Sequence, residues 1–478
     1  MFDLPFALPE GWEIKAVGQL VEAKVIEKPL DGNHGGIHPK SSDYVEAGVP
    51  FVMASDLENG RVNLEACKHI TEEQASSLRK GFSKPGDVLL SHKATIGRTA
   101  IVQENNNDYI MLTPQVTYYR VTDKTKLDNI YLKAYFDSAF FQSILGLWAG
   151  AGSTRAYLGI TGQLKLPIIV PPISSQRKIA EKVGAINSKI ALNRQTNQTL
   201  EEMAQAVFKS WFVDFEPTRA KIAAKENRED PTRAAMAALA GKTVEQLDTL
   251  SPEQITTLSA TAALFPDALE DSELGEIPVG WEAKPLYETA EYVNGGAFKA
   301  IDFCDPQEGL PIIKIAELKQ GIYDGTKYTL KDVKKRHFVT NDDVLYSWSG
   351  SPETSLEVFK WFGGDGWLNQ HIFKLNFSSA EQKYFTYYLL KQMKPILIGI
   401  AQDKQTTGLG HVTVADMKRL LVPSPDGAVL QRLKQVIAPL YEQCSTIEKE
   451  NMTLSETRAA LLPKLLTGEI EVNGGVAQ

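Results

Sequence analysis

Residues 176–215, QRKIAEKVGAINSKIALNRQTNQTLEEMAQAVFKSWFVDF, carry a regular hydrophobic pattern. The spacing between its positions alternates between four and three residues from Ile179 to Trp211, as in the heptad of a coiled coil. The positions are Ile179, Val183, Ile186, Ile190, Asn193, Asn197, Leu200, Ala204, Val207 and Trp211. The pattern predicts a long helix that packs against another helix along this seam.

The same seam recurs 254 residues later in the chain. Its positions are Leu433, Ile437, Leu440, Cys444, Ile447, Asn451, Leu454, Arg458, Leu461 and Leu465. Two helices with matching seams in one chain are expected to pack on each other. If they run antiparallel, Asn197 and Asn451 would meet near the helix midpoints, where a buried Asn pair lowers stability but fixes the register. The other interpretation is two unrelated amphipathic helices.

The segments that precede the two helices also repeat. Residues 8–15 read LPEGWEIK and residues 277–284 read IPVGWEAK, and further matched pairs follow in the same order. Short β-branched runs broken by Gly, Asn and Pro predict strands, and aromatic residues at helical spacing predict helices over 131–147 and 384–400. The expected fold class is α+β, with two pseudo-two-fold related globular α/β domains separated and joined by two long antiparallel coiled-coil helices.

A single segment between the two copies is acidic and rich in Ala. Asp230-Pro231 predicts a helix start there, Gly241 a helix stop, and Ser251 with Gln254 a capping box. The predicted organisation is a first domain over 1–172, a first long helix over 173–216, a connector over 217–276, a second domain over 277–428, a second long helix over 429–468 and a tail over 469–478.

Composition places the chain among ordinary globular proteins, because 43% of its 478 residues are hydrophobic and 23% are charged. The cysteines at 67, 304 and 444 are far apart, which favours a reducing cytoplasm. The sequence has neither a signal-peptide pattern nor an apolar run of about 18 residues, so no membrane partner is expected. The net charge of −8 argues mildly against nucleic acid, although residues 217–278 alone hold six Lys/Arg and eleven Asp/Glu.

The sequence offers little for catalysis. Its HxxxH spacing, His34-Gly-Gly-Ile-His38, lies in a glycine-rich stretch, and no Cys/His/carboxylate cluster with metal spacing is found, so no metal site is predicted. It also lacks GxxxxGK[ST] and the Asn-Pro-Pro-Tyr/Phe signature of amino-methyltransferases. Residues 150–155, GAGSTR, resemble a glycine-rich phosphate loop, but the sixth position is Arg155 and a helical pattern precedes it. We therefore expect no catalytic residue and no cofactor in this chain.

Polar loops occur instead at equivalent places in the two copies. Their side chains are of the types that read base edges: Arg or Lys on guanine, Asn or Gln on adenine, Ser or Thr on either. The alternative interpretation is that each of these residues, taken singly, is a solvated residue of a turn. The candidate DNA-binding residues are Asn33, His34, Ser91, His92, Lys93, Thr95, Arg98, Ser153, Thr154, Arg155, Asn294, Lys299, Trp348, Ser349, Ser351, Lys404, Gln405 and Thr406.

Several stretches resemble the specificity subunit of type I restriction–modification systems. The most specific ones close the two helices, FKSWFVDFEP at 208–217 and LLPKLLTGEI at 461–470. FPD at 265–267, followed by DSELGEIPVGW at 271–281, also resembles that family's entry into its second half. The resemblance extends over essentially the whole chain.

The resemblance implies a non-catalytic subunit whose two target-recognition domains each read one half of a bipartite double-stranded DNA site. It also implies partners: two modification subunits that carry the methyltransferase and its S-adenosylmethionine, and restriction subunits that use ATP and Mg. The expected place is the cytoplasm of a bacterium or archaeon. A single-chain DNA-modifying enzyme is the alternative, but it would need the missing cofactor and catalytic motifs. A coiled-coil protein for protein–protein interaction is a third interpretation.

Overall fold

The computed structural model describes residues 6–150, 156–323, 325–331, 333–405 and 409–470. Its contacts divide the chain into two compact units. Unit 1 comprises residues 1–192 and 451–478, and unit 2 comprises residues 193–450. The long helices α6 (Ile173–Phe212) and α14 (Gly427–Leu466) each contribute one part to each unit. Helix α6 begins where the sequence predicts and ends four residues earlier.

Unit 1 is built on a six-stranded and a four-stranded sheet. The six-stranded sheet has the order β2 (Leu30–Asp31), β11 (Val116–Tyr119), β8 (Val88–Lys93), β9 (Thr95–Ile101), β5 (Gly60–Val62), β4 (Leu57–Glu58). The four-stranded sheet has the order β6 (Lys68–Ile70), β3 (Val49–Val52), β10 (Ile110–Leu112), β7 (Phe82–Ser83). A separate antiparallel pair joins β1 (Glu13–Ala16) to β12 (Pro167–Val170). The helices before α6 are α1 (Val17–Glu22), α2 (Glu72–Ser77), α3 (Asn129–Asp137), α4 (Ala139–Ala149) and α5 (Ile160–Gln163).

Unit 2 repeats this plan with two four-stranded sheets. One has the order β16 (Glu291–Asn294), β24 (Ile372–Asn376), β20 (Val344–Ser347), β22 (Glu357–Lys360), and the other β18 (Tyr328–Thr329), β17 (Leu310–Ile313), β23 (Gly366–Leu368), β19 (Phe338–Val339). Antiparallel pairs join β15 (Glu282–Pro285) to β26 (Leu421–Ser424) and β21 (Ser349–Gly350) to β25 (Gly410–His411). The helices of this domain are α10 (Ile315–Gln320), α11 (Pro352–Ser355), α12 (Ala380–Asp403) and α13 (Val414–Arg419).

The order of the strands confirms the internal repeat. In both units an edge strand, β2 or β16, pairs antiparallel with β11 or β24, which in turn pairs antiparallel with β8 or β20, and the polar loops follow the same strands. The expected helix over 131–147 is divided into α3 and α4, because Ser138 adopts an extended backbone and its hydroxyl caps α4 at Phe141 N (3.2 Å). In the second copy α12 continues unbroken through Pro395.

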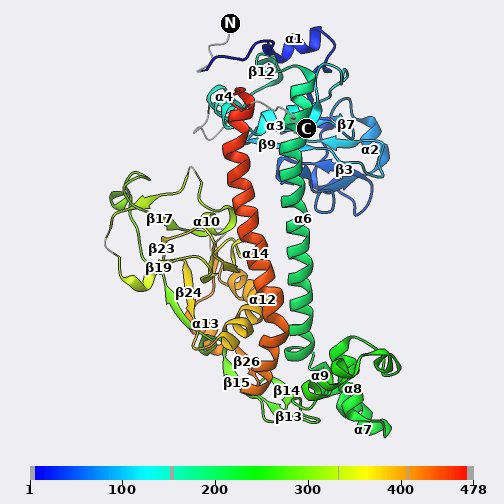
Figure 1. Ribbon diagram of the computed structural model, residues 1–478, viewed down its shortest axis with the longest axis vertical. Coiled ribbons are helices and arrows are strands. Elements are labelled where there is room, and N and C mark those ends of the chain that lie inside the picture. The colour runs from blue at the N-terminus through cyan, green and yellow to red at the C-terminus, as the bar shows by residue number, and fades with distance from the viewer. Residues whose placement is uncertain (1–5, 151–155, 324, 332, 406–408, 471–478) are drawn as a thin grey trace, which may run out of the picture. The chain divides into compact units, whose positions relative to one another are not determined.

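The heptad seam is confirmed in both long helices, which lie side by side (Figure 1). Every predicted seam position of α6 and of α14 is buried or half-buried. In unit 1, Ile179 and Val183 share a core with Leu462 and Leu465. In unit 2, Asn193 donates to Glu450 Oε2 at 2.8 Å and Asn197 donates to Glu448 Oε1 at 2.9 Å. The partner number falls as the α6 number rises, so the helices are antiparallel.

The expected pairing of Asn197 with Asn451 stays a prediction, because the two residues belong to different units. The amide of Asn197 donates to Glu448 Oε1 and, at 3.4 Å, to Cys444 O, both of which precede Asn451. Asn197 and Asn451 each lie C-terminal to the midpoint of their own helix. Asn197 still contributes a polar contact within the seam.

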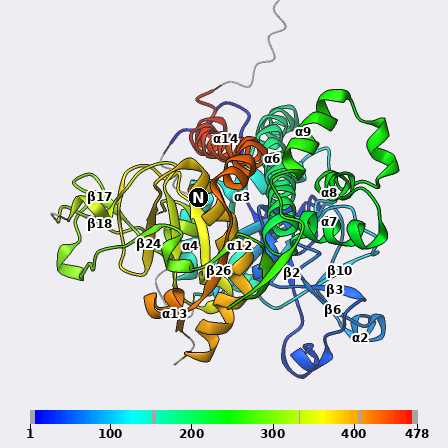
Figure 2. The ribbon, with the colours of Figure 1, turned by 90° about the horizontal axis from the view of Figure 1, so that it is seen from below.

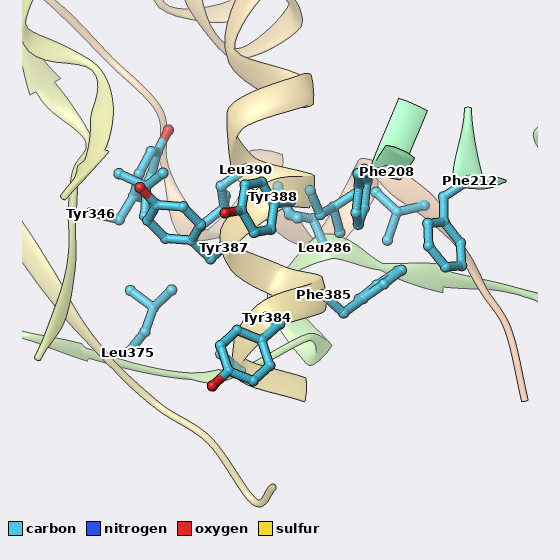
Figure 3. Packing of buried hydrophobic residues seen from close by; sticks show 14 of the residues in the cluster. Phe208, Phe212, Leu286, Tyr346, Leu375, Tyr384, Phe385, Tyr387, Tyr388 and Leu390 are labelled. Carbon is cyan, nitrogen blue, oxygen red and sulfur yellow. The ribbon is translucent and has the colours of Figure 1, made fainter. Parts of the chain in front are cut away.

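The C-terminal end of α6 is part of the core of the second domain. Phe208 is fully buried, and its ring centroid lies 5.5 Å from that of Phe385 and 6.4 Å from that of Tyr388, both on α12 (Figure 3). Phe212 lies edge-on to Phe385 at 5.3 Å. Buried aromatic rings contribute much of the packing energy of a core, so this cluster fixes α6 to α12.

The connector is a compact helical cluster of α7 (Glu216–Asn227), α8 (Pro231–Ala240) and α9 (Pro252–Ala262), followed by the hairpin β13 (Leu269–Ser272) and β14 (Gly275–Pro278). The three helices lie next to one another in both views (Figures 1 and 2). The predicted caps are present: Asp230 accepts from Thr232 N and Arg233 N, and Ser251 accepts from Gln254 N. The cluster has a small core of its own around Met236 and Leu247.

Candidate nucleic-acid interface

Three segments of unit 1 meet at the ends of β2 and β8, and we call residues 31–34, 91–98 and 156–158 the first loop cluster. The backbone holds them together: His92 O accepts from Leu158 N at 3.0 Å, and Ala156 O accepts from Ala94 N at 3.2 Å. Lys93 and Tyr157 form an antiparallel bridge. The structure therefore brings together segments that are about sixty residues apart in the sequence.

A buried polar network around Asp31 supports this cluster. Asp31 is ion-paired with Lys80, and its Oδ2 is hydrogen-bonded to His34 Nε2 at 2.7 Å. Burial raises the pKa of Asp31, but the hydrogen bonds from Lys80 and His34 outweigh this effect, so its pKa lies below the ordinary value. The carboxylate therefore stays charged at neutral pH.

His92 is fully buried and lies against this carboxylate. Burial lowers the pKa of His92, although the charge of Asp31 opposes that effect. Its Nδ1 donates to Leu158 O at 3.1 Å, and its Nε2 lies 4.0 Å from Asp31 Oδ2. The ring thus links β2, β8 and the segment at 158 at the base of the cluster.

Burial separates the candidate residues of unit 1 into two groups. His34, Lys93, Thr95 and Arg98 are exposed. Asn33, Ser91 and His92 are buried, so we correct their expected role from DNA contact to support. Asn33 donates to Lys80 O at 2.6 Å and accepts from Arg79 N, and Ser91 Oγ accepts from Arg98 N at 2.9 Å. Ser153, Thr154 and Arg155 lie outside the residues that the structure describes.

Unit 2 has an equivalent arrangement at the ends of β16 and β20, and we call residues 294–299, 348–351 and 410–411 the second loop cluster. Asn294 ends β16 as Asp31 ends β2, and it accepts a hydrogen bond from Trp348 Nε1 at 3.2 Å. Trp348 O accepts from Val412 N at 2.9 Å, as His92 O accepts from Leu158 N. An Asn–Trp pair therefore occupies the place that an Asp–His pair has in unit 1.

Most candidate residues of unit 2 reach the solvent. Asn294, Lys299, Ser351 and Gln405 are exposed, and Trp348 and Ser349 are half-buried. Lys404 is half-buried as well, and its Nζ donates to Asp416 Oδ1 at 2.6 Å. Burial raises the pKa of Asp416, but hydrogen bonds from Lys404 and Thr413 lower it to about 2. The DNA contact expected of Lys404 stays a prediction, on a side chain that is ion-paired with Asp416, and Thr406 lies outside the described residues.

Two exposed aromatic side chains in the clusters are absent from the sequence-based candidates. Tyr157 is 49% exposed and pairs with Lys93, and His411 is exposed and pairs with Ser349 in β21–β25. They are 254 residues apart, the same offset as the helix seams. That offset is the signal in the sequence that could have found them.

Among the residues that the structure describes, no group of three or more His, Cys, Asp or Glu side chains could hold a metal ion. Likewise, none of the helices in the described part of the chain has the length and apolar character needed to cross a membrane.

Comparisons with known proteins agree with the arrangement of the chain. The family model for the type I restriction modification DNA specificity domain matches residues 9–202 and 278–452. The type I restriction enzyme HindI specificity subunit of Haemophilus influenzae is 25% identical over 443 residues, which cover 88% of this chain and 94% of that protein. The MjaIX specificity subunit of Methanocaldococcus jannaschii is 23% identical, with 97% and 95% covered. A crystal structure of a type I restriction-modification S subunit from M. genitalium aligns with a TM-score of 0.45 at 13% identity, covering 97% of this chain and 98% of that one.

Proposed function

The chain belongs to the family of type I restriction–modification DNA specificity subunits, and from this premise we propose that its two loop clusters each read one half of a bipartite double-stranded DNA site. Subunits of this family are components of a restriction–modification complex and are not enzymes themselves. The observation that carries the proposal is the pair of equivalent clusters with different side chains. One scaffold that presents Lys93, Thr95 and Arg98 in one copy and Trp348, Ser349 and Ser351 in the other suits two different half-sites.

The net charges of the two domains bear on which subunits contact the phosphates of DNA. Residues 1–166 carry a net charge of −2 and residues 279–429 carry −1. Tight binding to DNA depends largely on cationic contacts to phosphates, whereas sequence is read at base edges. We infer that partner subunits supply most of the phosphate contacts and that this chain supplies base contacts.

The partners in this proposal are two modification subunits and the restriction subunits. The modification subunits would bind S-adenosylmethionine and methylate DNA, and the restriction subunits would use ATP and Mg. The relatives that share this architecture come from a bacterium and an archaeon, which supports a place in the cytoplasm of such a cell. The sequence motifs for a cofactor loop are missing, which disfavours a single-chain modifying enzyme.

The test is a selection of methylated sites from a random duplex library by the chain assembled with its modification subunits. We expect a two-part consensus separated by a spacer without base preference. The purified chain alone, given S-adenosylmethionine, should transfer no methyl group to the same DNA. A single contiguous consensus, or methyl transfer by the chain alone, would refute the proposal.

A further inference from the structure

Tyr157 and His411 occupy one equivalent position, and their backbone is fixed on both sides. Tyr157 N donates to Ala149 O at 3.0 Å, and the next residue, Leu158, donates to His92 O at 3.0 Å. His411 lies in β25 opposite Ser349, and the next residue, Val412, donates to Trp348 O at 2.9 Å. These bonds tie each ring to the strand end that carries the other exposed residues of its cluster.

The alternation of an extended chain explains why these rings point outward. Leu158 is 7% exposed and Val412 is fully buried, so the residue before each of them faces the opposite side. The backbone at β25 packs closely against the end of α12, because a Cβ at Gly410 would lie 2.3 Å from Ala401 O. A ring on such a backbone is presented without a further entropic cost of ordering the loop.

The buried network described above also fits this role. The ring of Tyr157 lies against His92, with centroids 5.7 Å apart, and His92 is held by Leu158 O. Asp31 lies on the other side of His92 and is itself fixed by Lys80 and His34. In unit 2, Trp348 takes the place of His92 and is fixed by Asn294. In unit 1 this support lies against the exposed ring of Tyr157, and in unit 2 the supported residue, Trp348, is bonded through its backbone to the residue after His411.

We propose that Tyr157 and His411 contact base edges, each in its own half-site, and determine the base preference at that point. This inference rests on the proposed function. A phenol and an imidazole can each donate or accept a hydrogen bond and can also pack on a base or a thymine methyl group. A phenol can also bond a phosphate oxygen, and such a contact would not depend on the base sequence. Two different rings at one position suit two different base pairs.

The experiment uses the complete complex with its modification subunits and the random duplex library. The variants are Tyr157→Ala, Tyr157→Phe and His411→Ala, and each is its own control because the other half-site is read in the same reaction. We expect Tyr157→Ala to reduce the preference for the recognised base about five- to tenfold, at one or two adjacent base pairs of one half-site. This reduction lies in the lower part of the range for a base contact. His411→Ala should act in the other half-site only.

Tyr157→Phe keeps the ring and removes the hydroxyl, so it separates hydrogen bonding from packing and also covers the case in which Tyr157→Ala does not fold. Loss of preference in Tyr157→Phe assigns the hydroxyl, and retained preference assigns the ring. A bipartite wild-type consensus that all three variants leave unchanged would overturn the inference while the proposed function stands. Uniform weakening on every sequence, or failure of a folded variant to bind the modification subunits, would overturn it as well. A wild-type complex without a bipartite consensus would refute the proposed function itself.

Discussion

Arg98 offers a sharp test of base reading in the first loop cluster. Its backbone N–H donates to Ser91 Oγ, and its Nη1 donates to Ala54 O at 3.2 Å and to Ser55 O at 3.1 Å. Its Nε and Nη2 have no hydrogen-bond partner among the residues that the structure describes. These two groups form one edge of the guanidinium, which has the geometry for a bidentate contact to guanine O6 and N7.

The substitution Arg98→Lys keeps the positive charge and removes the bidentate fork. A good bidentate pair contributes about 1–3 kcal/mol of discrimination, so we expect a roughly 5- to 150-fold loss of preference at one base pair of one half-site. The salt dependence of binding should not change, because the number of cationic contacts is the same. Arg98→Ala should lose the same preference and should also loosen the contact to residues 54 and 55.

The assay is the methylated-site selection with the assembled complex at two salt concentrations. Arg177→Lys is the matched control, because Arg177 is exposed on α6 in the same unit but outside the first loop cluster. If Arg98→Lys lowers binding equally on all sequences, or if both half-sites lose preference, Arg98 does not read a base as we argue.

Two predictions concern stability. Phe208→Ala removes a fully buried ring from the α6–α12 contact and should lower the free energy of unfolding by about 3–5 kcal/mol. Chemical denaturation would measure this loss, with Met203→Ala, a change at a 52% exposed position of the same helix, as the control. Equal losses of stability in both variants would contradict the packing argument. Asp416→Asn tests the ion pair with Lys404. Because the folded pKa of Asp416 is about 2 and the unfolded pKa about 3.9, its stabilisation is present above pH ~4 and is lost as the pH falls toward 2. The stability advantage of the wild type over Asp416→Asn should therefore shrink between pH 5 and pH 3, and an advantage that stays constant over this range would show that Asp416 is not the titrating group.

The repeat and the paired helices were predictable because both are periodic. A heptad seam reports burial directly, and every seam position is indeed buried or half-buried. The register of the helix pair was not predictable in the same way. It depends on where each helix begins and on contacts such as Asn193 with Glu450, which join residues more than 250 positions apart.

The loop clusters were predictable as groups but not residue by residue. Ser91 and His92 are polar residues that the sequence suggests for a loop. Both are buried, because they belong to β8 and the segment around residue 158 packs over them. Lys404 lies in a polar loop and would be expected to be an unpaired cation, yet it forms an ion pair with Asp416 in the first turn of α13. Tyr157 lies next to the polar loop residue Lys93 only in the folded chain, because the two are far apart in the sequence. In the sequence, Tyr157 could be found by matching it with His411 in the other copy.

The two loop clusters share their buried parts more closely than their exposed ones, and close backbone packing gives a reason. A Cβ at Gly32 would lie 1.9 Å from Leu112 O, and one at Gly295 would lie 2.2 Å from Asn369 O. Only glycine permits this approach, so the chain crosses the central strands at the same place in both units. The serines at 91 and 347 are likewise fully buried in the strands β8 and β20.

Beyond these fixed points the side chains meet few constraints. The residue before the glycine is Asp31 in one unit and Asn294 in the other, and the ring that it faces is His92 or Trp348. Each pair is complementary by itself, so an exchange of one member leaves a mismatched partner, whereas an exchange of both keeps the support intact. We therefore infer that the two members of such a pair change together when a loop cluster acquires a new preference. A single exposed substitution such as Arg98→Lys should alter preference without this cost, because Arg98 is supported by backbone carbonyls and not by either pair.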